Sequence, residues 1–143
     1  SPDQILSSVR LLLGKPEQGR ENVEVRRGLH VSALSDGNEL IIRAEDIGRH
    51  NTIDKIWGEC MLTGIATTDR LLVTTGRISS EMLLKAARME IPVVASLNSA
   101  TRRAVELGYD LGITVVGYVR GGQMSVYSHP RHITGLLAKE QLT

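Results

Sequence analysis

Five polar or ionisable side chains surround one glycine in the segment Glu45-Asp46-Ile47-Gly48-Arg49-His50-Asn51. A strand pattern precedes this segment and a helical pattern follows it. In α/β proteins the carboxyl end of a strand opens toward the ligand crevice, and a helix N-terminus offers free N–H groups to an anion. A structural interpretation stays open, in which Asn51 caps the helix and Asp54 complements its dipole. Arg49 would then pair with Glu45, and His50 would be an ordinary hydrogen-bonded imidazole.

A glycine, an arginine and two serines follow a second strand pattern, in the segment Thr74-Thr75-Gly76-Arg77-Ile78-Ser79-Ser80-Glu81. A flexible backbone and several donors aimed at one point are what a phosphate or another oxyanion needs. The segment is not a Walker loop, because the Gly-Lys-Ser ending is missing. Simple capping of the next helix by Ser79, with Glu81 in the first turn, explains part of the same pattern.

The third candidate segment contains a double glycine after an arginine: Tyr118-Val119-Arg120-Gly121-Gly122-Gln123-Met124. Glycine lets the backbone approach a ligand closely, and Arg120 would lie over that ligand. An ordinary hairpin turn at Gly121-Gly122 explains the same residues. All three segments follow strands that we expect to lie side by side in one sheet. We therefore predict that the segments meet at one crevice.

The remaining reactive side chains favour structural roles. Cys60 shares the apolar face of its helix with Ile56 and Trp57, where burial raises the pKa of a thiol and disfavours a nucleophile. As the only cysteine, it also excludes an intrachain disulfide and a cysteine-based metal site. His129 and His132 have neither cysteines nor paired acids nearby, so we expect them to be loop residues. The sequence predicts no metal site.

The overall composition is that of an ordinary globular domain. The chain has 143 residues, of which 41% are hydrophobic and 23% charged, so one domain with a sizeable core is expected. A net charge of +1 argues against sequence-independent nucleic-acid binding. No apolar run reaches the ~18 residues of a membrane span, and the first residues lack a signal-peptide pattern. We therefore expect a cytoplasmic protein without a nucleic-acid or membrane partner.

The elements that position the three segments are predicted from hydrophobic periodicity. Helices are expected over residues 1–14, 51–62, 79–89 and 101–110, the last capped by Ser99 or Asn98. Strands are expected over residues 29–34, 39–44, 71–75, 92–97, 113–120 and 124–128. The apolar run Val93-Val94-Ala95 lacks period-two alternation, as expected when helices cover both faces of a sheet. The fold class is therefore α/β, a three-layer mixed sheet. We divide the single domain 1–143 into a helix and linker (1–22), a core (23–134) and a tail (135–143).

The order of these motifs resembles the C-terminal part of the FdhD family, accessory proteins required for active formate dehydrogenases. Residues 45–51 followed by Asp54-Lys55 resemble the family's EDxGRHN-xxDK signature. Residues 76–82, with Lys85 and Ala86, resemble its GRxSSEMxxKA stretch. The further matches follow in order: Ile91-Pro92-Val93, Ser99-Ala100-Thr101, Ala104-Val105-Glu106-Leu107, Gly117-Tyr118-Val119-Arg120-Gly121-Gly122 and Val126-Tyr127-Ser128.

This resemblance implies a sulfur-transfer accessory role. The family takes persulfide sulfur from a cysteine desulfurase and passes it to the molybdenum or tungsten bis-pterin guanine dinucleotide cofactor of formate dehydrogenase. The partners implied are therefore the desulfurase, formate dehydrogenase and a second copy of the chain in a homodimer. The implied fold is similar to that of cytidine deaminases. Their zinc signature, His-x-Glu with a later Pro-Cys-x-x-Cys, is absent from this sequence, so deamination is not carried over.

The cofactor-binding stretch of the family carries over onto Val119, Arg120, Gly121, Gly122, Gln123 and Met124. We expect the other two segments to contribute to the same site through Glu45, Asp46, Gly48, Arg49, His50, Asn51, Gly76, Arg77, Ser79 and Ser80. A guanine nucleotide would serve as a surrogate for one end of the cofactor.

The main departure from the family concerns the sulfur carrier. The family carries sulfur on a Cys-x-x-Cys pair upstream of the matched region, and this chain does not contain that pair. Cys60 is not its counterpart, so the chain itself holds no catalytic residue. Either the pair lies outside this chain, or the protein is a nucleotide-binding module without sulfur-transfer chemistry. A second departure is Arg27, which stands where the family has a Thr-Gly-Gly lead into the position of His30.

Overall fold

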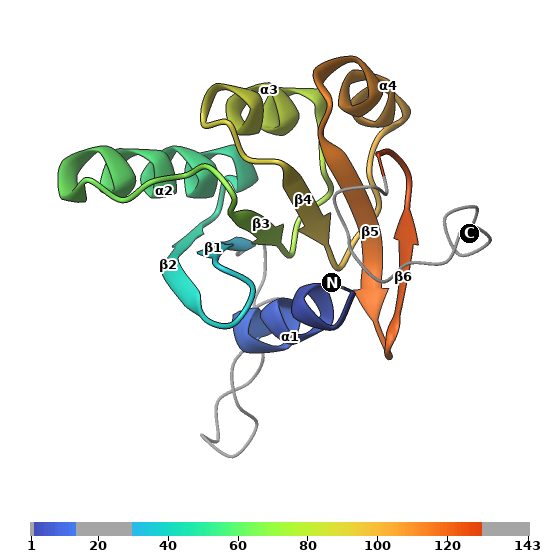
Figure 1. Ribbon diagram of the computed structural model, residues 1–143, viewed down its shortest axis with the longest axis horizontal. Helices are drawn as coiled ribbons and strands as arrows, with labels where there is room; N and C mark the ends of the chain where they lie inside the picture. The colour runs from blue at the N-terminus through green and yellow to red at the C-terminus, as the bar shows by residue number, and fades with distance from the viewer. Residues whose placement is uncertain (1, 14–29, 130–143) are drawn as a thin grey trace.

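Figure 1 shows the computed structural model, of which we describe residues 2–13 and 30–129. The elements in chain order are α1 (Pro2–Leu13), β1 (His30–Ser35), β2 (Leu40–Asp46), α2 (Arg49–Thr63), β3 (Leu71–Thr74), α3 (Ser80–Arg88), β4 (Val93–Ser96), α4 (Arg102–Leu111), β5 (Thr114–Arg120) and β6 (Gln123–Val126). Each agrees with a predicted element, with ends shifted by at most two residues. The predicted linker, the C-terminal tail, Arg27 and His132 lie outside the described residues.

The strands form one mixed sheet in the order β2-β1-β3-β4-β5-β6. Strands β3, β4 and β5 are parallel to one another, whereas β1 is antiparallel to both β2 and β3. Strand β2 therefore runs in the same direction as β3. Strand β6 is antiparallel to β5 at the opposite edge. The carboxyl ends of β2, β3, β4 and β5 consequently lie at the same end of the sheet.

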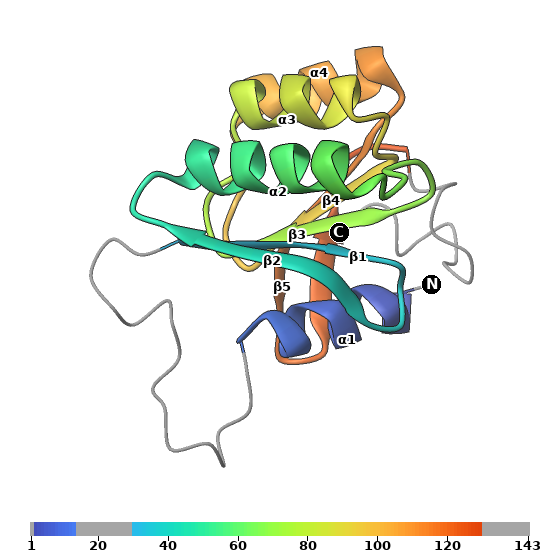
Figure 2. The same ribbon diagram turned by 90° about the vertical axis from the view of Figure 1, so that its left-hand side faces the viewer.

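Helices cover both faces of this sheet, so the fold has three layers. Figure 2 shows α2, α3 and α4 on one face and α1 on the other. Neighbouring strand residues alternate between two hydrophobic clusters: Leu72 and Val94 belong to the cluster under α2 to α4, and Val73 and Ala95 to the cluster under α1. Burial on both faces explains why these strands read as continuous apolar runs. The predicted three-layer mixed α/β sheet is confirmed.

Local sequence explains how several of these elements begin and end. The β1–β2 hairpin turns at Asp36-Gly37, where Gly37 has φ 100° and Asp36 Oδ1 accepts the N–H groups of Asn38 and Glu39. Helix α4 is capped by Thr101, whose hydroxyl accepts the Ala104 N–H at 3.1 Å. The predicted cap at Ser99 or Asn98 is therefore wrong.

The physical reason is that the chain between β4 and α4 is still extended where those two residues occur. Ala100 forms a parallel bridge with Ile78, so the helix starts only after it. The Asn98 side chain instead accepts the Ser99 N–H at 2.7 Å. None of the helices in the described part of the chain is long and apolar enough to cross a bilayer.

Two helical glycines should respond to alanine in opposite directions. In α2, a Cβ at Gly58 would meet no atom within 4 Å, so Gly58→Ala should stabilise the fold by about 0.5–1 kcal/mol through helix propensity alone. In α4, a Cβ at Gly108 would lie 2.8 Å from Ser128 Oγ and 2.8 Å from Val115 Cγ2. Gly108→Ala should therefore destabilise the fold by about 1–3 kcal/mol. Urea unfolding of the two variants beside the parent chain measures both effects, and a shift of the same sign in both would contradict the packing described here.

Candidate functional site

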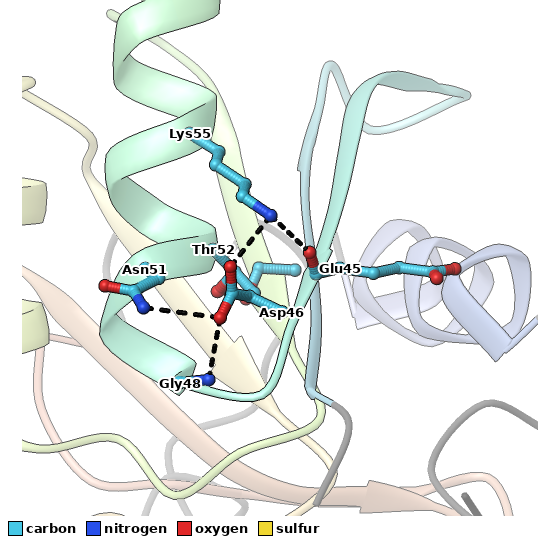
Figure 3. A network of polar contacts seen from close by, with 7 residues as sticks. Glu45, Asp46, Gly48, Asn51, Thr52 and Lys55 are labelled. Atoms are coloured by element: carbon cyan, nitrogen blue, oxygen red, sulfur yellow. Dashed lines mark hydrogen bonds and ion pairs between the residues drawn. The ribbon is translucent and has the colours of Figure 1, made fainter.

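Asp46, the last residue of β2, is the centre of a polar network between β2 and the start of α2 (Figure 3). Its Oδ1 accepts the Gly48 N–H at 2.9 Å and the Asn51 side-chain amide at 3.3 Å. Its Oδ2 lies 2.8 Å from Lys55 Nζ, and the same ammonium group donates to the Glu45 carbonyl at 2.8 Å. The network ties the end of the strand to the first two turns of the helix.

These contacts keep Asp46 ionised. The hydrogen bond from Lys55, followed by those from the Gly48 N–H and the Asn51 amide, holds the pKa of Asp46 well below its ordinary value of 3.8. A carboxylate in this state does not exchange protons near neutral pH, so Asp46 is unsuited to general acid or base catalysis. Its role is to fix the connection between β2 and α2.

The start of α2 differs from the structural interpretation of the sequence. The helix begins at Arg49, followed by His50, and its N-cap is Gly48. Asn51 therefore does not cap the helix, and its side-chain amide contacts Asp46 instead. Gly48 leaves the first turn of α2 without a side-chain cap, whereas α3 and α4 each have one. The side chains of Arg49 and His50 lie outside the described part, so the predicted Arg49–Glu45 pair stays a prediction.

Two further ion pairs surround this segment. The dipole interpretation required Asp54 to lie in the first turn of α2, but this residue lies further along the helix. Its Oδ1 is instead 2.9 Å from Lys85 Nζ of α3. Glu45 pairs with Arg43 at 2.5 Å, and in Figure 3 its side chain extends away from Asp46. The Asp54–Lys85 pair joins the first and second predicted segments through their helices.

A chain of buried hydroxyl groups connects the candidate segments below the surface. Ser32 Oγ of β1 donates to Thr74 Oγ1 at 2.9 Å and lies 2.7 Å from Thr52 Oγ1 of α2. Because Ser32 has a single hydroxyl proton, Thr52 donates to Ser32. Thr74 Oγ1 also accepts the Gly76 N–H at 3.2 Å, and Ser96 of β4 donates to the Gly76 carbonyl at 2.6 Å. All four hydroxyl side chains are fully buried, so each needs these partners.

Hydrogen bonds fix both ends of the loop between β3 and α3, which contains the second segment. Ser79 Oγ accepts the Met82 N–H at 3.3 Å, which confirms the capping interpretation for this residue. Ile78 is fully buried and anchors the loop in the core, while Arg77 beside it is exposed and Ser80 is half-buried. The loop therefore presents one guanidinium group to solvent at the carboxyl end of β3.

The third segment forms the turn between β5 and β6. Gly121 and Gly122 have φ values of 59° and 75°, and Arg120 is paired with Gln123 across the turn. This confirms the hairpin-turn interpretation of the double glycine. Val119 is 1% exposed, whereas Arg120, both glycines and Gln123 are exposed. A Cβ at either glycine would meet no atom within 4 Å, so the space over the turn is open to a ligand.

The three segments share one end of the sheet, but the strands before them are not side by side. Strand β1 separates β2 from β3, and β4 separates β3 from β5, so the predicted adjacency is wrong. With about 4.8 Å between neighbouring strands, the ends of β2 and β5 are on the order of 20 Å apart across the sheet. A ligand that contacts all three segments must extend over that width.

Asn98 completes the polar connection between the second and third segments. Its N–H donates to Ser96 Oγ at 2.9 Å, and its carbonyl accepts the Tyr118 N–H at 3.0 Å. The hydroxyl chain and Asn98 therefore link the start of α2, the Gly76 loop and the end of β5. The sequence reasoning missed Ser32, Thr52 and Ser96, and it assigned no linking role to Thr74 or Asn98. The available signal was one hydroxyl residue inside each apolar run, at Ser32, Thr74 and Ser96.

An open hollow of about 440 Å³ lies between β2 and α2. Arg43, Lys55 and Glu59 line it, and of the predicted site residues it includes Glu45 alone. The hollow is therefore not the shared crevice that the sequence predicted. Within residues 2–13 and 30–129, no cluster of three His, Cys, Asp or Glu side chains is placed to hold a metal ion.

The fold is a mixed α/β domain with polar and glycine-rich loops at the carboxyl ends of parallel strands, which is where α/β domains commonly bind ligands. A model of the FdhD/NarQ family matches residues 2–134, and the chain belongs to this family. The resemblance predicted from the sequence motifs is thus confirmed.

Relatives and a solved structure agree with this assignment. The chain is 41% identical over 133 residues to the sulfur carrier protein FdhD of Bacillus subtilis (strain 168), covering 93% of the chain and 49% of that relative. It is 47% identical over 106 residues to the protein of the same name from Staphylococcus aureus (strain MRSA252), covering 74% of the chain and 40% of that relative.

A crystal structure from Desulfotalea psychrophila, of a protein assigned as a formate dehydrogenase accessory protein, matches with a TM-score of 0.78 and 33% identity. The match covers 92% of the chain and 57% of that structure. The chain thus spans about half the length of the proteins that it matches. The likeness to cytidine deaminases stays a prediction.

Replacing Asp46 by asparagine should remove stability in a pH-dependent way. The pKa of Asp46 is lower in the folded chain than its ordinary value of 3.8, so its contribution is complete above that value and is lost as the pH falls through the folded pKa. The melting temperature of Asp46→Asn should therefore be lower than that of the parent chain by a constant amount above about pH 5, and the gap should narrow below about pH 4.

The matched control is Asp110→Asn on α4, outside this network. In the same series of thermal melts, the difference in melting temperature between this variant and the parent chain should not narrow below about pH 4. A gap for Asp46→Asn that widens toward acid pH would contradict the assigned ion pair. Because the Asp46–Lys55 pair is partly exposed, added salt should also reduce the gap.

Proposed function

We propose that the chain binds the guanine nucleotide end of a molybdenum or tungsten bis-pterin guanine dinucleotide cofactor, as part of a sulfur-carrying accessory protein of formate dehydrogenase. The observation that carries this proposal is that the family's own signature residues build one end of the sheet. Asp46 contacts both Asn51 and Lys55 there, and the hydroxyl chain joins the Gly76 loop to the same helix at Thr52. The names of the relatives support the sulfur-carrying role.

The exposed groups at this end of the sheet are each suited to a phosphate group. Arg77 and Arg120 present planar guanidinium groups, which suit bidentate contacts with phosphate oxygens. The N-cap residue Gly48 offers no side-chain acceptor to the first-turn N–H groups of α2, which favours an anion at that helix end. A pterin dinucleotide is an extended ligand, so its two halves can contact different loops. The separation of the three segments is therefore compatible with one bound cofactor.

The remaining parts of the role are proposed on the family resemblance and on the relatives. A cysteine desulfurase would supply the sulfur, formate dehydrogenase would receive the sulfurated cofactor, and two copies of the chain would form a homodimer. The cofactor supplies the metal and the pterin thiolates when it is bound. The chain's own groups bind and orient its nucleotide end.

A second candidate function is a nucleotide-binding module without sulfur transfer, and the position of Cys60 favours it for this chain taken alone. Cys60 is 3% exposed and packs in the core cluster with Ile53 and Ile56. Burial, followed by the nearby charge of Glu59, raises the pKa of the Cys60 thiol. A buried neutral thiol is a poor acceptor for persulfide sulfur.

Calorimetry with guanosine and guanosine diphosphate tests the binding proposal. The diphosphate should bind about tenfold more tightly or better, because each charge-assisted contact is stronger than a neutral hydrogen bond. Arg77→Ala and Arg120→Ala should each reduce the difference in affinity between guanosine diphosphate and guanosine. Arg88→Ala, at an exposed arginine that ends α3 and so lies away from the helix N-termini, should leave the difference between the two affinities unchanged. Equal affinities for guanosine and its diphosphate would refute the anion-binding part of the proposal.

Labelled sulfur separates the two candidate functions. When the chain is incubated with a cysteine desulfurase and labelled cysteine, we expect no label on the protein. Cys60→Ala should leave nucleotide binding intact and reduce the stability by about 1 kcal/mol. A label on the parent chain that disappears in Cys60→Ser would make Cys60 the carrier and overturn this assignment. A label that appears only after a Cys-x-x-Cys segment is joined upstream would support it.

A further inference from the structure

Strand β2 lies at one edge of the sheet, and part of its backbone faces outward. Within the described residues, no strand pairs with the outer side of β2. Val31 of β1 directs its backbone groups toward β3, since its carbonyl accepts the Thr75 N–H at 2.9 Å and its N–H donates to Thr75 Oγ1 at 3.1 Å. Glu45, which is opposite Val31, therefore directs its own backbone groups outward. Because bonding alternates along an antiparallel pair, the backbone groups of Arg43 also point outward.

The outward groups of Arg43 and Glu45 determine where another strand could pair with β2. The Glu45 carbonyl accepts the Lys55 ammonium group at 2.8 Å, which occupies this acceptor near the carboxyl end of the strand. An added antiparallel strand can still exchange two hydrogen bonds with the N–H and carbonyl of Arg43, and it can accept the Glu45 N–H. The edge therefore favours a strand that is centred near Ala44.

The open hollow of about 440 Å³ lies beside this edge. Its lining comes from β2 and α2 and includes no residue of β1, so the hollow is on the outer side of β2. A Cβ at Gly58 would meet no atom within 4 Å, and Leu62 is 87% exposed. An edge strand with a groove between it and a helix can accept a peptide as an added strand: the main chain gives affinity, and alternate side chains enter the groove.

The side chains of β2 determine which residues such a strand should carry. Ile42 and Ala44 pack against the core cluster under α2, so a residue opposite Ala44 points toward the hollow. Arg43 and Glu45 alternate with them, and the Glu45 side chain extends away from α2 in Figure 3. Opposite charges across two strands are stabilising, whereas like charges are destabilising. Along an antiparallel strand the expected order is therefore a basic residue opposite Glu45, a large apolar residue opposite Ala44 and an acidic residue opposite Arg43.

We propose that the edge of β2 and the adjoining hollow bind an extended peptide segment of a partner protein as an added antiparallel strand. The segment has the order basic, large apolar, acidic. Its apolar side chain enters the hollow beside Gly58, and its two charged side chains pair with Glu45 and Arg43. The proposal goes beyond the proposed function and does not rest on it, because neither Arg77 nor Arg120 lines the hollow.

A second copy of the chain fits this surface less well than a partner segment does. Two β2 strands could pair about Ala44, because the order Arg43-Ala44-Glu45 places opposite charges across from each other. The central side chain would then be a single methyl group, which leaves most of the hollow unfilled. A larger apolar side chain buries more surface there and so gains more free energy. The size of the central residue thus distinguishes a partner segment from a second copy.

Fluorescence anisotropy with three labelled peptides, each flanked by serines, tests the proposal. Thr-Lys-Leu-Glu-Val should bind the parent chain about fivefold or more tightly than the charge-exchanged peptide Thr-Glu-Leu-Lys-Val, which places like charges opposite Arg43 and Glu45. It should also bind about tenfold more tightly than Thr-Lys-Ala-Glu-Val, which cannot fill the hollow. If the first peptide does not bind, or binds no better than either of the others, the proposal is wrong.

Variants at Gly58 separate a filled hollow from a damaged fold. Gly58→Gln places a long side chain beside the hollow on a good helix former, so it should keep the melting temperature of the parent chain and weaken Thr-Lys-Leu-Glu-Val about tenfold. Gly58→Ala, whose methyl group is too small to fill the hollow, is the matched control and should bind this peptide as the parent chain does. Equal binding by Gly58→Gln and Gly58→Ala would contradict the proposed position of the apolar side chain.

A charge exchange in the chain itself provides the reciprocal test. The double variant Arg43→Glu with Glu45→Arg can keep an ion pair between these positions, and it should reverse the preference between the two charge-ordered peptides. An unchanged preference would refute the assigned register. Analytical ultracentrifugation identifies the other occupant: a dimer of the parent chain that Arg43→Glu dissociates would make a second copy the occupant and overturn the proposal. If the parent chain binds the peptide but not guanosine diphosphate, the proposed function fails and this proposal stands.

Discussion

The antiparallel position of β1 between β2 and β3 determines which strand ends lie together in this domain. Because β1 runs against both neighbours, β2 has the same direction as β3, β4 and β5. Three of these four strands lead directly into a helix, so the N-termini of α2, α3 and α4 all come to the same end of the sheet. Donor groups that are far apart in the sequence are thereby collected at one end without any long loop.

Adjacent residues of α2 then fix that helix in two directions. Lys55 binds the carboxylate of Asp46 and so ties the helix to β2, while Asp54 binds Lys85 and ties it to α3. Partly exposed ion pairs of this kind contribute little to the free energy of unfolding. Their consequence is positional: they orient α2 relative to both neighbours and thus set where its uncapped first turn points. The family's Asp-Lys signature has a structural meaning here, which a catalytic interpretation would miss.

Much of this arrangement could be predicted from the sequence, for identifiable reasons. Apolar spacing located each helix and strand, and the ordered motifs identified the family. The order of strands could not be obtained in this way, because apolar runs such as Leu71-Leu72-Val73 are equally suited to any central position. For the same reason the predicted adjacency of the three segments was wrong. The cap of α2 was misplaced because Asn51 is a good cap by residue type, whereas here Asp46 takes up its side-chain amide. The positive φ of Tyr118, in the irregular part of β5 between Gly117 and Arg120, had no sequence signal, because tyrosine rarely adopts this conformation.

The buried hydroxyl chain also limits how this domain can change during evolution. Ser32 is bonded to both Thr52 and Thr74, so replacing any one of the three by an apolar residue removes at least one hydrogen bond from a buried hydroxyl, at a cost of about 0.5–1.5 kcal/mol. Replacing the set together by apolar residues of similar shape can be nearly neutral. Substitutions at these positions should therefore occur jointly, and intermediates with one replacement should be rare among descendants of this sequence. These three residues, one each from α2, β1 and β3, are thus expected to change together, although all of them are buried.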